Sequence, residues 1–287
     1  DGGYIVGGYF ASSTIELDNG ITLTNKGSDD GMAIIKYSAE GESEWAKVIG
    51  GSYIDSITSV AASSDGGYIV GGYFASSTIE LGNGITLTNM GKKDGMLIKY
   101  NAEGEVEWGK VIGGDDDDQI QTVAISEDGE YIVGGYLKSN TIKLDNGITL
   151  GRKNFIDGML IKYDTEGVAK WIKVIGGEGV NQIQTVAENL DGSYIVGGNF
   201  TTTIELNNGI TLINKGNRDG ILIKYKLNDI VKSDIKYGKV IGGNKEDYIT
   251  SVAASEDGGY IVGGYFSSTI ELDNGTILTN KGEQDGM

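Results

Sequence analysis

With 287 residues, of which 39% are hydrophobic, the chain has the composition of a globular protein rather than a disordered one. Its formal net charge of −18 argues against nucleic acid as a partner, and no apolar run approaches the roughly 20 residues of a membrane helix, so we expect no membrane insertion. The chain contains no Cys and no His, which excludes disulfides, thiolate nucleophiles and histidine chemistry.

One sequence unit recurs along the chain. The opening segment DGGYIVGGYF (1–10) returns four more times with small changes, at intervals of 63 to 66 residues. The first tyrosines of the five copies are Tyr4, Tyr68, Tyr131, Tyr194 and Tyr260. A fixed period of this size indicates a repeat architecture. The absence of proline, against an average of about 5%, fits one unit copied many times.

Each unit reads as four main strands with an additional hairpin. In the second copy the expected strands are 57–63, 68–74, 96–100 and 105–112, and the hairpin is 78–89. The strand segments are rich in β-branched residues and are bounded by Asp-Gly and Gly-containing turns. An Asn-Gly pair inside the hairpin segment is the strongest short hairpin signal. No segment has a helical period, so the sequence predicts an all-β protein.

A four-stranded unit of about 63 residues is typical of a β-propeller blade, here with an extra hairpin between its second and third strands. A β-solenoid fits less well, because its coils run about 20–30 residues, and units this small rarely form separate sandwich domains. We predict a single repeat domain over 1–287, divided into a partial blade 1–55, blades 56–118, 119–181 and 182–247, and a partial blade 248–287. Five blades are favoured, with four to seven compatible, and we expect the chain to be a piece of a longer array.

The pentapeptide IVGGY at 5–9 also opens many trypsin-like proteases, and its glycines suggest a phosphate loop. A protease needs a His base, and a phosphate loop needs a Lys followed by a helix, and both are missing here. We therefore expect these residues to form a strand whose two glycines allow a neighbouring sheet to approach closely.

The string ITSVAASSDGGYIVGGYF at 57–74, followed by DGMLIKYNAEGEVEWGKVIGG at 94–114, resembles the bacterial β-propeller repeats of the SBBP type. Those repeats pair a VAVD…GN-YVTG hairpin with a D-FVAKYD-NG-W-K hairpin. The resemblance extends over essentially the whole chain and implies a propeller fold and an exported bacterial protein, extracellular or on the cell surface. Two features depart from the pattern: GGY replaces the GN-Y step, and the fourth copy has a longer turn with Tyr237 in place of Trp.

Several recurring or acidic features are candidate sites. The loop GGDDDDQ at 113–119 could bind Ca²⁺ weakly, but its acidic residues do not recur in the equivalent loops, so a solvated loop is favoured and no cofactor is expected. The recurring Asp-Gly pairs have ordinary turn chemistry. These aspartates form two groups. The group at the start of the expected third strands consists of Asp30, Asp94, Asp157, Asp219 and Asp285. The group in the turns before the second strands consists of Asp65, Asp128, Asp191 and Asp257. The series Trp45, Trp108, Trp171 and Tyr237 is expected to pack between blades rather than to stack on a sugar.

The copies differ mainly in two sets of loops. These loops connect the fourth strand of one unit to the first strand of the next, or precede the third strand. In an antiparallel blade both sets emerge on one face, and loops on a rigid scaffold carry function. We expect any ligand to contact this face, although drift in unconstrained loops explains the variation equally well. The ligand-face candidates are Tyr53, Asp55, Asp115, Asp116, Asp117, Asp118, Phe155 and Tyr248.

The sequence therefore predicts a non-catalytic binding module, an adhesin-like scaffold for a protein or glycan ligand. A catalytic residue should break the repeat, and the deviations here are mild and lie in loops. One alternative is a self-assembling structural protein in which incomplete terminal blades exchange strands with a neighbour. A carbohydrate-active enzyme that uses paired carboxylates is the lesser alternative.

Overall fold

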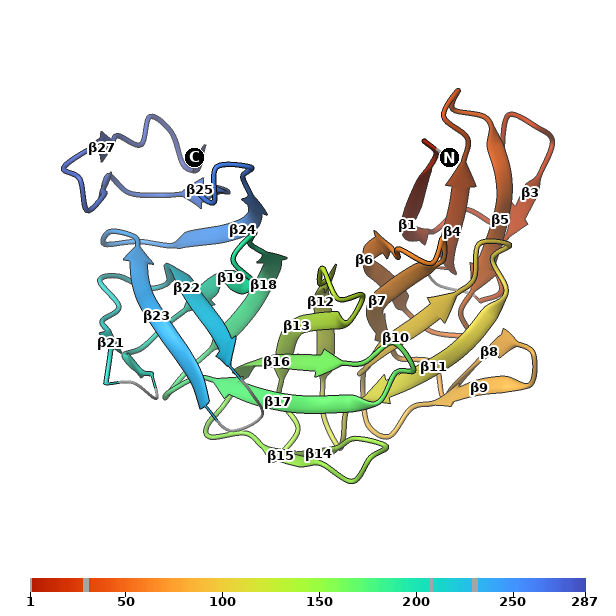
Figure 1. The fold of residues 1–287 in the computed structure, drawn as a ribbon, viewed down its shortest axis with the longest axis horizontal. Coiled ribbons are helices and arrows are strands. Elements are labelled where there is room, and N and C mark those ends of the chain that lie inside the picture. The colour runs from red at the N-terminus through yellow and green to blue at the C-terminus, as the bar shows by residue number, and fades with distance from the viewer. Residues whose placement is uncertain (1, 28–30, 207–208, 229–231) are drawn as a thin grey trace. The chain divides into compact units, whose positions relative to one another are not determined.

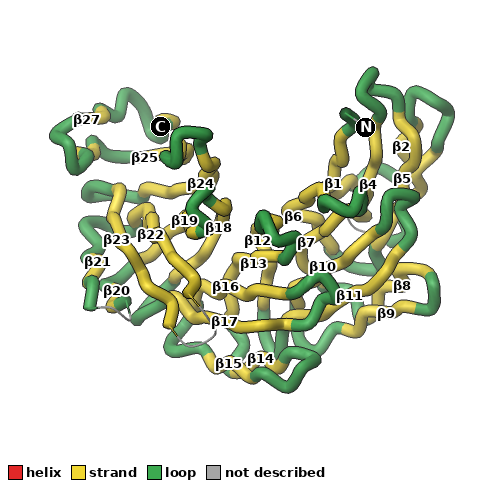
Figure 2. The backbone as a smooth tube through the Cα atoms, viewed as in Figure 1, coloured by secondary structure: helices red, strands yellow, loops and turns green. Residues whose placement is uncertain are grey.

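The computed structural model describes residues 2–27, 31–206, 209–228 and 232–287. These residues form short antiparallel sheets joined by turns and loops, without a helix in the described part of the chain (Figures 1 and 2). The prediction of an all-β protein is confirmed. Of the recurring Asp-Gly residues, Asp30 lies outside the described residues.

The chain divides into two compact units, which are described separately. Unit 1 consists of Asp1–Ile125, Ser139–Gly151 and Tyr163–Ala169, and unit 2 consists of Ser126–Lys138, Arg152–Lys162 and Lys170–Met287.

A complete sheet of unit 1 shows how one repeat folds. Its strands are β6 (Asp55–Ala62), β7 (Tyr68–Phe74), β10 (Asp94–Tyr100) and β11 (Val106–Ile112), hydrogen-bonded in the order β11-β10-β7-β6. β6 pairs with β7 and β10 pairs with β11 across Gly-containing turns, as predicted, and β7 pairs with β10 across the inserted hairpin. The first and third strands begin two residues earlier than predicted, at the two aspartates.

The other sheets repeat this order, completely or in part. In unit 2, the strands β18 (Asn181–Glu188), β19 (Ser193–Phe200), β22 (Asp219–Asn228) and β23 (Lys232–Ile241) are hydrogen-bonded in this order. The repeat between these two sheets contributes the strands β12 (Asp118–Ile125), β13 (Tyr131–Leu137), β16 (Asp157–Tyr163) and β17 (Ala169–Ile175). The sheet β1-β4-β5 (Tyr4–Phe10, Gly31–Tyr37, Ser43–Ile49) holds the second to fourth strand positions. The sheet β24-β25-β28 (Asp247–Ala254, Tyr260–Phe266, Asp285–Gly286) holds the first to third positions.

The additional hairpin between the second and third strands is present in every copy. In β8–β9 (Thr78–Gly82, Ile85–Thr88) the turn residues Asn83 and Gly84 have φ of 51° and 76°, the left-handed conformation that Asn-Gly hairpin turns favour. The other hairpins are β2–β3 (Thr14–Glu16, Thr22–Thr24), β14–β15 (Thr141–Lys143, Thr149–Gly151), β20–β21 (Ile204–Glu205, Thr211–Leu212) and β26–β27 (Ile270–Glu271, Ile277–Leu278).

The glycines of IVGGY allow neighbouring sheets to pack closely, as predicted. A Cβ at Gly71 in β7 would lie 2.6 Å from Val123 Cγ1 and 2.9 Å from Ile120 Cγ2, both in β12 of the same unit. Gly7 in β1 has the same relation to β6, with Val60 Cγ1 at 2.6 Å. The core therefore lies between successive sheets, and only glycine leaves room for the next first-position strand.

The tryptophan of the fourth strand also packs between sheets. Trp45 in β5 donates its indole N–H to the carbonyl oxygen of Ala102 at 3.3 Å, and its ring lies against Gly104 in the next turn between third and fourth strands. A Cβ on Gly104 would be 3.0 Å from Trp45 Cε2. Trp108 has the same relation to Gly167. The predicted packing role is confirmed for Trp45 and Trp108.

The insertion in the fourth copy differs from the prediction of a longer turn. β22 and β23 are each ten residues long, and their pairing continues to Leu227↔Ser233 and Asn228↔Lys232. The described part of the insertion therefore lengthens both strands of the hairpin, because the added residues satisfy their backbone groups by continuing the ladder.

Candidate ligand-binding rim

The two variable loop sets meet along one rim in each unit. In unit 1, Lys93 and Asp117 form a short parallel bridge, and the Asp118 N–H donates to the Lys93 carbonyl oxygen at 2.7 Å. In unit 2, the Asn181 N–H donates to the Ile156 carbonyl oxygen at 2.9 Å in the same way. The segment before a third strand thus lies beside the loop that leads into the next first strand, which confirms the predicted placement on one face.

A buried aspartate fixes this rim at the start of several first strands. Asp55 is 0% exposed and accepts hydrogen bonds from the Gly51 N–H at 2.8 Å, the Ala75 N–H at 3.0 Å and the Ser76 hydroxyl at 2.7 Å. Asp118 and Asp247 make equivalent bonds. Each carboxylate therefore ties the loop before its strand to the segment that follows the second strand of the same sheet.

The sequence-predicted candidates of unit 1 fall into two groups. Asp55 and Asp118 are two of these buried aspartates and lie away from the surface. We call such an aspartate, together with the loop and segment that it ties by hydrogen bonds, an aspartate bracket. Tyr53 is 60% exposed on the rim, and Asp116 forms an ion pair with Lys92 at 2.9 Å. Asp115 accepts hydrogen bonds from the backbone and side-chain N–H groups of Asn140, both at 3.1 Å, which lower its pKa. Asp117 takes part in the parallel bridge. The side chains of Asp115, Asp116 and Asp118 thus have different partners, while Asp117 is held through its backbone.

The candidates of unit 2 lie at two places on its rim. Phe155 is 59% exposed, and its carbonyl oxygen accepts a hydrogen bond from Arg152 Nη1 at 2.8 Å. The ring of Tyr248 stacks on Tyr265 with centroids 4.5 Å apart, and Arg218 Nη1 donates to the Tyr248 hydroxyl at 2.6 Å. Both aromatic side chains belong to the variable loops or to the strand end next to them.

A polar crevice of about 680 Å³ opens on the rim of unit 2. Lys153 and Asn154 line it from the segment before β16, and Glu178 lines it from the loop before β18. Thr202 and Thr203 line it from the segment after β19. Gly177 allows the loop to approach, because a Cβ there would lie 2.5 Å from the Thr203 carbonyl oxygen. The crevice therefore combines both variable loops.

The aspartate bracket is altered at this crevice. Asn181 replaces the aspartate and Thr202 replaces the serine that pair as Asp118 and Ser139 in the preceding copy. Asn181 is 1% exposed and donates its amide N–H to the Ile156 carbonyl oxygen at 3.2 Å. The Asn181 Oδ1 and Thr202 Oγ1 atoms are buried without a hydrogen-bond partner. Such atoms cost about 1–3 kcal/mol each until a partner reaches them.

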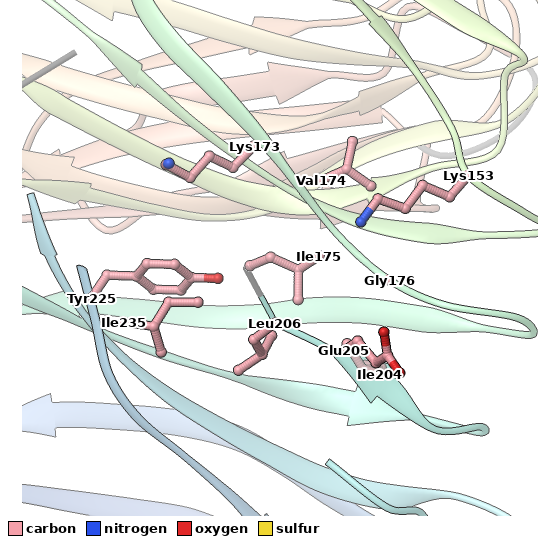
Figure 3. A pocket seen from close by; sticks show the side chains of 10 residues that line it. All are labelled: Lys153, Lys173, Val174, Ile175, Gly176, Ile204, Glu205, Leu206, Tyr225 and Ile235. Atoms are coloured by element: carbon pink, nitrogen blue, oxygen red, sulfur yellow. The ribbon is translucent and has the colours of Figure 1, made fainter. Parts of the chain in front are cut away.

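Beneath the crevice is a small apolar pocket of about 20 Å³, which has room for about one water molecule (Figure 3). The side chains of Ile175, Leu206, Tyr225 and Ile235 converge on it, while Lys153 lies at its edge (Figure 3). Burial raises the pKa of the Tyr225 hydroxyl, which keeps it neutral. The pocket is therefore a floor for the crevice rather than a second binding cavity.

Two buried carboxylates approach each other where the variable loops meet in unit 1. Burial raises the pKa of Asp94 to about 6, against hydrogen bonds from the Met90 and Gly114 N–H groups, and the charge of Asp118 adds to the rise. The Asp94 Oδ1 atom is buried without a hydrogen-bond partner. In unit 2, burial likewise raises the pKa of Asp219, with a contribution from Asp247. Asp94 and Asp219 therefore both have a raised pKa, and burial is the main cause in each.

Within the described residues no three acidic side chains group as a metal ion would require. The part of the chain that the structure describes also has no helix long and apolar enough to cross a membrane. Protein-family models and curated proteins were both searched with this sequence, and neither search gave a match.

The sequence predicted that the two variable loop sets share one rim, but it did not indicate the residues that line the crevice. Lys153, Glu178 and Thr202 lie within or beside the loops named as variable. The available signal was the exchange of Asp for Asn at 181, because this copy alone departs from the buried bracket at that position while keeping the strand that follows.

Proposed function

We propose that this protein is a non-catalytic extracellular binding module of the β-propeller type, related to the SBBP repeats of bacterial surface proteins, and that it binds a glycan or protein ligand at its variable rim. The repeated order of four antiparallel strands and the close packing of successive sheets support a propeller, for which five blades remain our proposal. The acidic composition favours neutral or cationic ligands.

The observation that carries this proposal is the crevice of unit 2. It has the volume of a small-ligand site and polar side chains from two variable loops, and one of its lining residues, Thr202, has a buried hydroxyl oxygen without a partner. A neutral glycan suits it, because sugar hydroxyls both donate and accept hydrogen bonds. A sugar hydroxyl in the crevice can accept a hydrogen bond from Thr202 Oγ1.

The test is a glycan-array screen of the purified chain followed by titration of each positive glycan. The double variant Asn181→Asp with Thr202→Ser restores the bracket that Asp118 and Ser139 form elsewhere. We expect it to lose binding at least tenfold while its thermal unfolding midpoint stays the same or rises, because the carboxylate regains its N–H and hydroxyl partners.

Ser76→Thr is the matched control, because it changes a bracket residue of unit 1 far in sequence from the crevice residues. Binding should persist in this variant. If the double variant binds as tightly as the unchanged chain, the crevice is not the binding site. If no glycan or protein ligand binds the unchanged chain, the proposed function itself is wrong.

A further inference from the structure

The segment before a third strand packs tightly on the following loop in several copies of the repeat, and a glycine makes this possible. In unit 1, a Cβ added at Gly27 would lie 2.4 Å from the carbonyl oxygen of Gly51, in the loop before β6. Gly91 has the same relation to the loop before β12, at 2.3 Å, and Gly216 in unit 2 has it to the loop before β24, at 2.7 Å. Because a real Cβ does not come this close to an oxygen atom, any other residue would push the loop away.

Asn154 has this place in the third copy of the repeat. It stands three residues before the aspartate that begins the third strand, which is the position of Gly91 in the second copy. Its Cβ excludes the close approach, so the loop before β18 cannot close on the segment as the other loops do. On its other side this loop stays packed, because a Cβ at Gly177 would lie 2.5 Å from the Thr203 carbonyl oxygen. The gap on the Asn154 side is the crevice, which Asn154 and Gly177 both line.

The turn before this position is also altered in the third copy. In the second copy, Asn89 Oδ1 accepts a hydrogen bond from the Gly91 N–H at 2.8 Å, which fixes the turn that leads into the glycine. Arg152 replaces this asparagine, and its side chain has no acceptor atom. Arg152 Nη1 instead donates to the Phe155 carbonyl oxygen at 2.8 Å. Two substitutions in one segment therefore change how it meets the loop.

The opening is confined to this part of the rim. Two residues after Asn154, the Ile156 N–H donates to the Gly179 carbonyl oxygen at 3.2 Å, and the Asn181 N–H donates to the Ile156 carbonyl oxygen at 2.9 Å. The loop is therefore still joined to the segment where the strands begin. The crevice thus has two anchored walls, one from the segment and one from the loop.

Asn154 also presents a hydrogen-bonding group to the crevice. It is exposed, and among the residues that the structure describes its side-chain amide has no partner. An amide contains a donor and an acceptor side by side, so it can bind two neighbouring hydroxyl groups of one sugar ring. Lys153 and Glu178 line the crevice from its two walls and add a donor and an acceptor. The walls therefore offer both kinds of partner that a neutral sugar requires.

We infer that Asn154 opens the crevice and selects its ligand, a neutral sugar with neighbouring hydroxyl groups that bind the Asn154 amide. The inference rests on the proposed function, because it concerns the same site. The other copies have glycine at this position, namely Gly27, Gly91, Gly216 and Gly282. One chain should therefore bind one sugar ligand rather than one per repeat.

The opening can be measured without a ligand. The chain contains no cysteine, so Thr203→Cys supplies a single thiol on the crevice wall. In this background Asn154→Gly should slow alkylation by a bulky maleimide about threefold or more, because the segment can close on the loop and shield the thiol. Asn154→Ala keeps the Cβ and should leave the rate unchanged. Circular dichroism of each variant checks that the sheets remain folded.

Asn217→Gly is the matched control, because it makes the same exchange in the corresponding segment of the fourth copy. It should change neither the alkylation rate nor sugar binding. If the thiol of the Asn154→Gly variant reacts as fast as that of the background chain, or if Asn154→Ala slows the reaction equally, Asn154 does not open the crevice and the inference is overturned.

Binding is measured by calorimetric titration of the chain with the methyl glycosides of glucose, galactose and mannose. We expect at least one of them to bind with a stoichiometry of one per chain. Asn154→Gly should weaken this binding at least about tenfold, and Asn154→Ala, which loses the amide alone, should weaken it about three- to tenfold. Equal affinity of the unchanged chain and the Asn154→Gly variant would overturn the inference.

The outcomes separate this inference from the proposed function. If none of the glycosides binds but another glycan or a protein binds the chain, the inference about the Asn154 ligand is wrong and the proposed function stands. If nothing in the wider screen binds, the proposed function is wrong, whatever the alkylation rates show.

Discussion

The first glycine of IVGGY can be tested by comparing two copies within unit 2. A Cβ at Gly197 would lie 2.7 Å from Ile249 Cγ2, 2.8 Å from Thr185 Cγ2 and 3.1 Å from Val252 Cγ1. Gly263 has the same place in β25, where the nearest atom to such a Cβ is 3.8 Å away. The same substitution, Gly to Ala, therefore meets a tightly packed sheet at one position and only ordinary van der Waals contact at the other.

The expected magnitudes follow from these distances. At Gly197 three side-chain atoms lie well inside ordinary carbon contact, and overpacking of this kind costs about 1–3 kcal/mol. Alanine in a strand regains about 0.5–1 kcal/mol over glycine, so Gly197→Ala should lose about 1–2 kcal/mol and Gly263→Ala should gain up to about 1 kcal/mol. The difference of about 2 kcal/mol corresponds to a melting-temperature gap of about 4–8 °C.

Thermal unfolding followed by circular dichroism measures this gap. Adding Thr185→Ser to Gly197→Ala removes one of the overlapping methyl groups, while the hydroxyl can still accept the Val252 N–H, so part of the loss should be recovered. If both alanine variants melt together, or if Gly197→Ala is the more stable, the glycine does not serve close packing and the reasoning is refuted.

Asp55→Ala should cost about 3 kcal/mol, because it leaves several buried N–H groups without an acceptor, and urea unfolding should show a larger loss than Ser76→Ala produces. Asp94 has a folded pKa of about 6, above its unfolded value, so its contribution favours folding below the unfolded pKa and is lost as the pH rises through about 6. Asp94→Asn should flatten that fall relative to the unchanged chain, and equal pH profiles would contradict the assignment. Trp45→Ala should destabilise unit 1 by about 3 kcal/mol, read by chemical denaturation, since the ring packs on Gly104 and lies 5.9 Å from Tyr68.

Much of the fold follows from local signals in the sequence. The period of the repeat, the Asn83-Gly84 turn and the Asp-Gly turns place the strands and hairpins correctly, because these signals act over a few residues. The antiparallel order then places both variable loop sets on one rim. The sequence did not show that Asp55 and Asp118 are buried, because their N–H donors come from segments about twenty residues away in the chain.

The same brackets explain why the rim loops can differ between copies. Asp55, Asp118 and Asp247 fix the ends of their loops by backbone hydrogen bonds, which do not depend on the side chains in between. Those side chains are then free to change without moving the strand that follows. Where Asn181 replaces the aspartate, some of these hydrogen bonds are lost, and Asn181 Oδ1 and Thr202 Oγ1 are buried without partners. Buried polar atoms without partners are uncommon in native proteins, and this cost is what supports our proposal that a ligand binds at this position of the rim.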